Sequence, residues 1–154
     1  MQFANLLKPG AVRVLAHQTS KKRLFHDLGD IAQDVYDIDA QAALDALQER
    51  ENLGPTGVGQ GVALPHARIP AIDTVRGVFV RLERAIDFDS VDRQPVDLVF
   101  ALFAPGGTGV DHLKALALVS RTLRNQGVCE KLRANDAPET LYAVLTEAQD
   151  SQAA

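Results

Sequence analysis

His66 ends a segment, GVGQGVALPH at residues 57–66, in which alternating glycines and a proline precede an imidazole. Glycine permits backbone conformations and close approaches that a Cβ would block, and proline fixes φ just before the histidine. An imidazole is nucleophilic and largely neutral near pH 7, so it can accept a proton or an electrophile such as a phosphoryl group. The segment therefore favours a functional histidine, with an ordinary surface or core histidine as the alternative.

His112 and Arg50 are candidates to act beside His66. His112 follows Asp111 at the start of an expected helix, where free backbone N–H groups and the helix dipole favour an anion. Arg50 lies in the last turn of another expected helix, and a guanidinium can bind phosphate oxygens through two parallel hydrogen bonds. Sequence spacing alone does not bring the two histidines together, and both candidates also fit ordinary roles at a helix end.

Nucleotide and metal chemistry have weaker signals. The glycines of GVGQG do not match GxGxxG after a strand, and the segment lacks the Gly-Lys-Ser/Thr ending of a phosphate-binding loop. A metal site would need a third ligand near one histidine, and the sequence has no HxH, HExxH or cysteine pair, although Asp111 could contribute. We therefore predict neither a metal nor a cofactor.

The composition limits the classes of protein. With 154 residues, 46% of them hydrophobic, the chain can bury one core, which predicts one domain. A net charge of -4 disfavours a nucleic-acid partner. The single cysteine, Cys129, cannot form an intrachain disulfide, and no apolar run reaches the length of about 18 residues typical of a membrane span. These features predict a cytoplasmic protein that does not insert into membranes.

Periodicity predicts most of the elements that must position these residues. Apolar residues at three- and four-residue spacing indicate helices over 21–36, after Ser20, and over 40–51, after Asp39. Alternation indicates a strand over 76–88, and the nearly continuous apolar run over 96–105 indicates a strand at the sheet centre, covered on both faces.

The last third of the sequence reads as helical. Asp111 is expected to cap a helix that Gly127 ends, a short helix is expected near 129–135, and Asp136 with Glu139 forms the capping-box pattern of a final helix. Together the elements predict an α/β fold with a mixed β-sheet flanked by helices. We expect a single domain over 1–154, with a core at about 7–145 and a frayed tail at 150–154.

Three blocks in this order resemble a known family. RENLGPTGVGQGVALPHARI, FDSVDRQPVDLVFALFAP and DHLKALALVS are similar to the fructose/mannitol-type enzyme IIA domain of the bacterial phosphotransferase system, and most similar to its nitrogen-regulatory branch, IIA-Ntr. The likeness spans about residues 7–145. Many relatives have glycine directly after the histidine where this sequence has Ala67, and the loop APGGTGVD is unusually rich in glycine.

The resemblance implies a phosphotransferase that carries phosphohistidine. By this likeness, His66 accepts a phosphoryl group from the phosphohistidine of a small HPr-like carrier (NPr), and Arg50 and His112 stabilise the group in transfer. Thr56 is a further candidate hydroxyl donor. The phosphorylation state would then control binding to regulatory target proteins, such as potassium-transport or stress-signalling components.

Other functions stay open at this point. A sugar-specific IIA would pass the phosphoryl group to a IIB partner, and separate proteins of that kind exist. A non-catalytic module could use the glycine segment and His66 to recognise a peptide or a small anion. A metallohydrolase is the third alternative.

Overall fold

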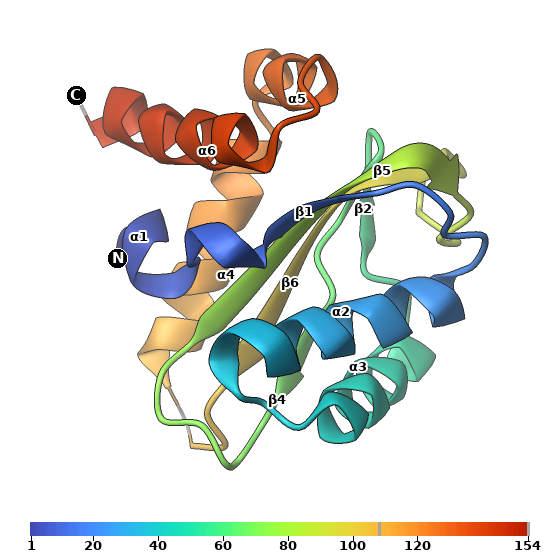
Figure 1. Ribbon diagram of the computed structural model, residues 1–154, viewed down its shortest axis with the longest axis vertical. Helices are drawn as coiled ribbons and strands as arrows, with labels where there is room; N and C mark the ends of the chain where they lie inside the picture. The colour runs from blue at the N-terminus through green and yellow to red at the C-terminus, as the bar shows by residue number, and fades with distance from the viewer. Residues whose placement is uncertain (108, 154) are drawn as a thin grey trace.

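A six-stranded sheet forms the centre of the computed structural model, which describes the backbone of residues 1–107 and 109–153 and the side chains up to residue 148. The strand order is β1-β5-β6-β3-β2, and β4 also pairs with β6 (Figure 1). The strands are β1 (Val12–Leu15), β2 (Gly57–Gly59), β3 (Val62–Ala63), β4 (His66–Arg68), β5 (Arg76–Ile86) and β6 (Val96–Ala104).

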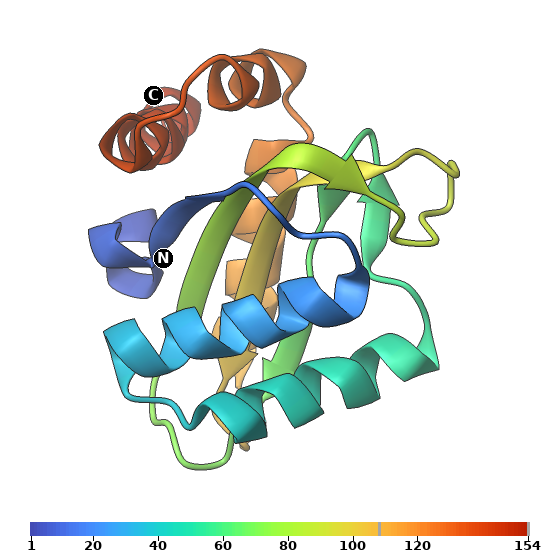
Figure 2. The same cartoon turned by 45° about the vertical axis from the view of Figure 1, so that its right-hand side comes forward.

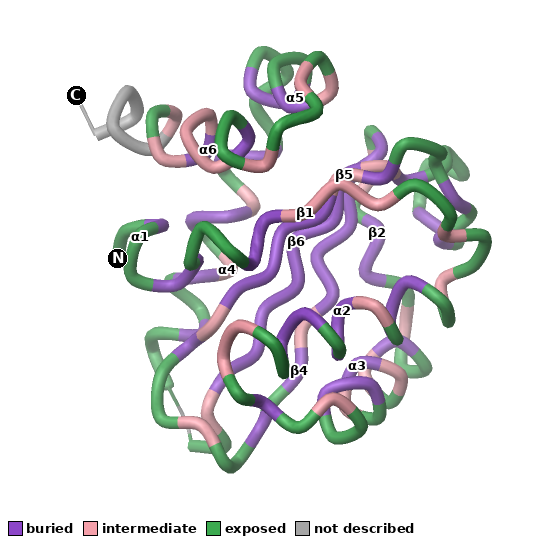
Figure 3. Tube along the Cα trace, in the orientation of Figure 1, coloured by how far each residue is buried: buried purple, intermediate pink, exposed green. Residues whose placement is uncertain are grey.

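The sheet is mixed, as predicted. β5 and β6 pair antiparallel, whereas β1 runs parallel to β5, and β3 and β4 both run parallel to β6. Every residue of β6 except Asp97 is buried, and the buried trace of Figure 3 runs through this strand. The apolar run over 96–105 therefore lies inside the sheet, since a strand covered on both faces has no polar side to show to water.

Helices cover both faces of the sheet, which confirms the predicted α/β class. They are α1 (Phe3–Leu6), α2 (Lys21–Tyr36), α3 (Ala40–Leu53), α4 (Val110–Leu123), α5 (Gln126–Arg133) and α6 (Pro138–Ala153), with a 3-10 turn at Pro9–Ala11. Figure 2 shows α2 and α3 in front of the sheet and α4 behind it.

The predicted starts of α2 and α3 are confirmed at the level of single hydrogen bonds. The Ser20 hydroxyl accepts from the backbone N–H of Arg23 at 3.1 Å, and the Asp39 carboxylate accepts from that of Ala42 at 2.9 Å. Each side chain thus satisfies one of the N–H groups that a helix start leaves without a partner. α3 ends at Leu53, directly before Gly54.

Two predicted boundaries near α4 are wrong. α4 begins at Val110 with Gly109 as N-cap, so Asp111 lies inside the first turn and is not the cap. α4 also ends earlier than Gly127, because the side chain of Asn125 accepts from the N–H of Val128 and starts α5, in which Gly127 is helical. The polar cap of a new helix thus decides the boundary rather than the glycine.

The predicted capping box of α6 is also wrong. α6 begins at Pro138, a residue suited to the first helical position, and the Asp136 carboxylate accepts from Arg81 of β5 at 2.8 Å instead. Residues 150–153 belong to this helix. Ala154 and the side chains from residue 149 onward lie outside the described residues, so the expected fraying of 150–154 stays a prediction.

Candidate functional site

The glycine-rich segment forms a β-hairpin rather than the loop that its composition favours. β2 and β3 pair antiparallel around a turn in which Gly59, Gln60 and Gly61 all have positive φ (100°, 57° and 80°). Glycine adopts this left-handed region without the clash that a Cβ would cause. Arg133 of α5 donates to the Gln60 carbonyl and to Asp97, which ties the hairpin tip to the helical layer.

The strand that follows the hairpin fixes the backbone of His66. β3 and β4 both pair with β6, and the pairing is interrupted at Leu64 and Pro65. His66 resumes it opposite Leu102, whose N–H donates to the Pro65 carbonyl. The imidazole is therefore presented from a strand end that is hydrogen-bonded to the central strand.

Two hydrogen bonds define the state of the His66 ring. Nδ1 lies 3.0 Å from the Leu64 carbonyl oxygen. A carbonyl can only accept, so the proton is on Nδ1 and the lone pair is on Nε2. Nε2 in turn accepts from Nε of Arg50 at 3.2 Å, while Nη1 of Arg50 donates to the Gly54 carbonyl at 3.0 Å. His66 thus has its nucleophilic nitrogen beside a fixed cation.

His112 meets His66 across the site. The two rings pack edge to face with centroids 5.6 Å apart. His112 is buried, and its Nε2 has no hydrogen-bond partner among the described residues. Burial, followed by the charges of His66 and Arg68, holds the pKa of His112 below its ordinary value. The neutral ring is therefore favoured, with one polar atom free for a bound group.

A shallow cavity of about 440 Å³ joins the predicted residues. Arg50, His66 and His112 all line it. Leu53, which is 82% exposed, forms part of its wall, and the exposed Val110 and Leu113 flank His112 in the first turn of α4. The lining thus combines cationic and imidazole groups with apolar side chains and with one carboxylate, that of the exposed Glu49.

Arg68 is a lining residue that the sequence analysis missed. It lies two positions after His66 on β4, and alternate residues of a strand share a face. Its guanidinium donates to the carbonyls of Pro105 and Gly107, which fastens the loop after β6 to the site. The i, i+2 spacing could have revealed it only with β4 recognised as a strand.

Thr56, the further candidate hydroxyl donor, is hydrogen-bonded to Glu51 in this structure. Its hydroxyl donates to a carboxylate oxygen of Glu51 at 2.5 Å, and its backbone N–H donates to the other at 2.7 Å. Thr56 does not line the cavity. Lys21 also contacts the Glu51 carboxylate at 3.6 Å. This buried cluster holds the turn after α3, directly behind Arg50.

We expect Glu51→Gln to destabilise the fold. The amide keeps the size of the side chain but cannot accept from both Thr56 donors and also pair with Lys21, so a buried donor is left unsatisfied. Urea denaturation should show a free energy of unfolding lowered by about 1–3 kcal/mol. Glu49→Gln, on the exposed side of the same helix, is the matched control and should change it by less than about 0.5 kcal/mol. Equal stability of the two variants would contradict a structural role for Glu51.

Among the side chains that the structure describes, those of residues 1–107 and 109–148, no group of three or more from His, Cys, Asp and Glu is placed to hold a metal ion. Within that same part of the chain, no helix has both the length and the apolar character needed to cross a membrane.

Comparison with known proteins decides the family. Residues 5–148 match the model of the phosphoenolpyruvate-dependent sugar phosphotransferase system, EIIA 2. The chain belongs to this EIIA family. The EIIA chain is 44% identical over 145 residues to a nitrogen regulatory protein of Bradyrhizobium diazoefficiens, an alignment that covers 94% of this chain and 95% of the relative. It is 40% identical over 129 residues to a fructose-specific EIIA component of Haloferax volcanii, in an alignment that covers 83% of this chain and 84% of that relative.

A solved structure supports the same assignment for this EIIA fold. The crystal structure of the nitrogen regulatory protein IIA-Ntr from Neisseria meningitidis superposes with a TM-score of 0.84 at 32% identity, covering 92% of this chain and 97% of that one. The resemblance to the EIIA family and its nitrogen-regulatory branch, which the three sequence blocks indicate, is confirmed. Proteins of this family transfer phosphoryl groups between phosphoproteins.

Proposed function

We propose that this EIIA protein accepts a phosphoryl group on Nε2 of His66 from the phosphohistidine of an HPr-like carrier such as NPr. The observation that carries the proposal is the hydrogen bond from Nδ1 to the Leu64 carbonyl, because it leaves the Nε2 lone pair available in an open cavity. The lone pair forms the new P–N bond, and the electron pair of the broken P–N bond returns to the carrier's imidazole.

The neighbouring groups suit this transfer. Arg50 already donates to Nε2, so it lies where a phosphoryl group would arrive, and its guanidinium then turns from the nitrogen to the phosphoryl oxygens. A phosphoryl oxygen also gives the unpartnered His112 ring a hydrogen-bond partner. Arg68, from the same cavity, adds a second positive charge. No cofactor takes part, since the phosphoryl group arrives with its carrier.

The rim of the cavity favours a protein as donor. Leu53, Val110 and Leu113 are large apolar side chains with more than half of their surface exposed. Exposed large apolar side chains that gather near a functional site are typical of surfaces that bind other proteins. A carrier docked on them would exclude water from the labile phosphohistidine during transfer.

Regulation is the proposed output. Near-full-length similarity to nitrogen regulatory proteins supports phosphorylation-dependent binding to target proteins, and potassium-transport or stress-signalling components are the proposed class of target. We place this activity in the cytoplasm, where such carriers act. A sugar-specific role, with onward transfer to a IIB partner, is the second candidate, because a fructose-specific EIIA component is 40% identical.

The test is transfer from an HPr-like carrier that has been phosphorylated beforehand. Intact-mass spectrometry should show a gain of one phosphoryl group, lost again in mild acid, because P–N bonds hydrolyse there. Addition of a fructose-type IIB domain then distinguishes the regulatory from the sugar-specific function. A regulatory IIA protein keeps the phosphoryl group, whereas a sugar-specific IIA protein passes it to IIB. Absence of any mass gain with NPr and HPr carriers would overturn the proposal.

A further inference from the structure

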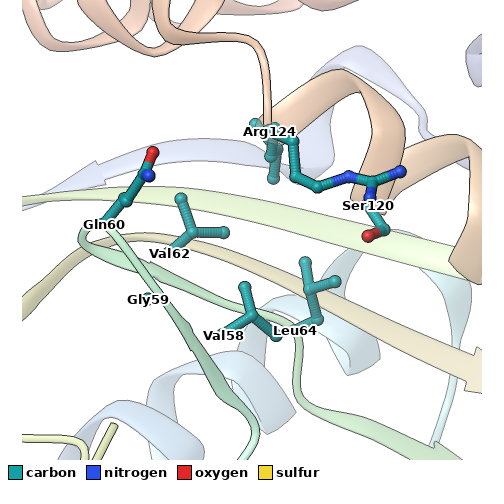
Figure 4. A pocket seen from close by; sticks show the side chains of 8 residues that line it. Val58, Gly59, Gln60, Val62, Leu64, Ser120 and Arg124 are labelled. Carbon is teal, nitrogen blue, oxygen red and sulfur yellow. The ribbon is translucent and has the colours of Figure 1, made fainter. Parts of the chain in front are cut away.

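A second cleft, of about 280 Å³, lies away from the His66 cavity, between the β2–β3 hairpin and the C-terminal end of α4. Figure 4 shows its two walls: Val58, Val62 and Leu64 point from the hairpin side toward the helix, and Ser120 and Arg124 lie on the helix side. It shares none of its lining residues with the cavity that holds Arg50, His66 and His112. The transfer mechanism does not use it.

The cleft combines an aliphatic wall on the hairpin side with unpaired polar groups on the helix side. Val58, Val62 and Leu64 are aliphatic. Val58 is 55% exposed, so part of its apolar surface is available to a ligand. Neither the Arg124 guanidinium nor the Ser120 hydroxyl has a hydrogen-bond or ion-pair partner among the described residues. Apolar walls with a few convergent polar groups are typical of small-molecule sites.

The cleft is bounded by the segment directly before His66 and by the helix that carries His112. The side chain of Leu64 lines the cleft, while its carbonyl accepts the hydrogen bond from Nδ1 of His66. On the other wall, Ser120 belongs to α4, the helix that carries His112 in its first turn. A molecule wedged between these walls would therefore act on the backbone that orients His66.

We propose that this cleft is an effector site for a small branched-chain monocarboxylate without an ammonium group, and that its occupation shifts the imidazole of His66. The Arg124 guanidinium would bind the carboxylate, the Ser120 hydroxyl would donate to it, and the aliphatic body would lie on the valines and Leu64.

The chemistry of the walls selects this class. Among the described residues that line the cleft none carries a carboxylate, and the nearby Asp92 carboxylate already accepts from the backbone N–H of Gln60. An ammonium group would therefore gain no carboxylate partner from the lining and would face Arg124. A volume of about 280 Å³ lies just below the usual range of small-molecule sites, so the cleft suits only a small ligand. A branched aliphatic chain fills a space between branched side chains better than a linear one.

The first experiment is a titration of the 15N-labelled protein with isocaproate, followed by amide chemical shifts. We expect saturable shifts at residues 58–64 and 120–124 and none with sodium chloride at the same ionic strength. Isocaproamide, which has the same shape without charge, should bind at least about tenfold more weakly, as should leucine. Equal binding of acid and amide, or no saturable shift with the acid, would overturn the carboxylate site.

Variants separate the site from a general charge effect. Arg124→Gln should weaken isocaproate binding by at least about tenfold and leave the fold intact, because the side chain contacts no described partner. Arg84→Gln, at an exposed and likewise unpartnered arginine of β5, is the matched control and should bind as wild type does. If both variants bind equally well, Arg124 does not bind the ligand and the assignment fails.

The coupling to His66 has its own readout, independent of any phosphoryl transfer. Long-range 1H–15N spectra report the imidazole nitrogens, and saturating isocaproate should shift the Nδ1 and Nε2 signals of His66 but not those of the exposed His26. Binding in the cleft without a shift at His66 would overturn the effector role. Because the readout needs no carrier, this result and a failure of the transfer assay are distinguishable.

Discussion

His66→Ala is expected to abolish acid-labile phosphorylation completely. The structure gives His66 the lone pair at the bottom of the cavity, and alanine leaves no atom there that can bond to phosphorus. His112 does not replace it, because His112 is only 8% exposed and its Nε2 is buried. The measurement is intact mass after incubation with a phosphorylated carrier, before and after mild acid.

Two further substitutions make this result specific. His112→Ala should still acquire the phosphoryl group, more slowly, because it loses a neighbour of the transferring oxygens but not the acceptor. His26→Ala removes an exposed histidine of α2 and should label as wild type does. Labelling that survives in His66→Ala and disappears in His112→Ala would reverse the assignment of the two histidines.

Arg50→Ala is expected to slow transfer to His66 by between about 10- and 100-fold. Two effects oppose each other. Loss of the 3.2 Å hydrogen bond frees the Nε2 lone pair, which favours attack by about 1 kcal/mol. Loss of a fixed cation beside the transferring oxygens costs about 3 kcal/mol of transition-state stabilisation. The second effect is larger, so the net change is a slower reaction, which rapid-quench single-turnover measurements would show.

The control for Arg50 must separate charge from structure, since Arg50 also donates to the Gly54 carbonyl. Arg50→Lys keeps the charge without the planar two-donor geometry, so its rate should lie between those of wild type and Arg50→Ala. Arg23→Ala, at an exposed arginine of α2, should leave the rate unchanged. Transfer by Arg50→Ala at the wild-type rate would exclude a catalytic role for this guanidinium.

The long periodic elements of the fold could be predicted from the sequence, whereas its short strands could not. α2, α3, β5 and β6 span 9–16 residues each, which is enough for a helical or apolar pattern to emerge. β1, β2, β3 and β4 have 2–4 residues each. They are strands because distant segments supply their hydrogen-bond partners, and no local pattern contains that information.

Some residues of the site could likewise be predicted from the sequence, and others could not. The types of His66, Arg50 and His112 and the family likeness indicated one site, and the structure brings the three residues to one cavity. Arg68 and the Glu51 cluster did not emerge, because their roles depend on which loop carbonyls and side chains the fold places against them.

In the proposed transfer, the hydrogen bond between Nδ1 of His66 and the Leu64 carbonyl also determines the chemical identity of the product. Phosphohistidine exists as two regioisomers, one for each ring nitrogen. The protein makes the choice between them before any donor arrives, because one nitrogen is committed to the backbone. Only the isomer substituted at Nε2 can form without breaking that bond, so an antibody raised against the Nδ1 isomer would not detect this phosphoprotein in a cell extract.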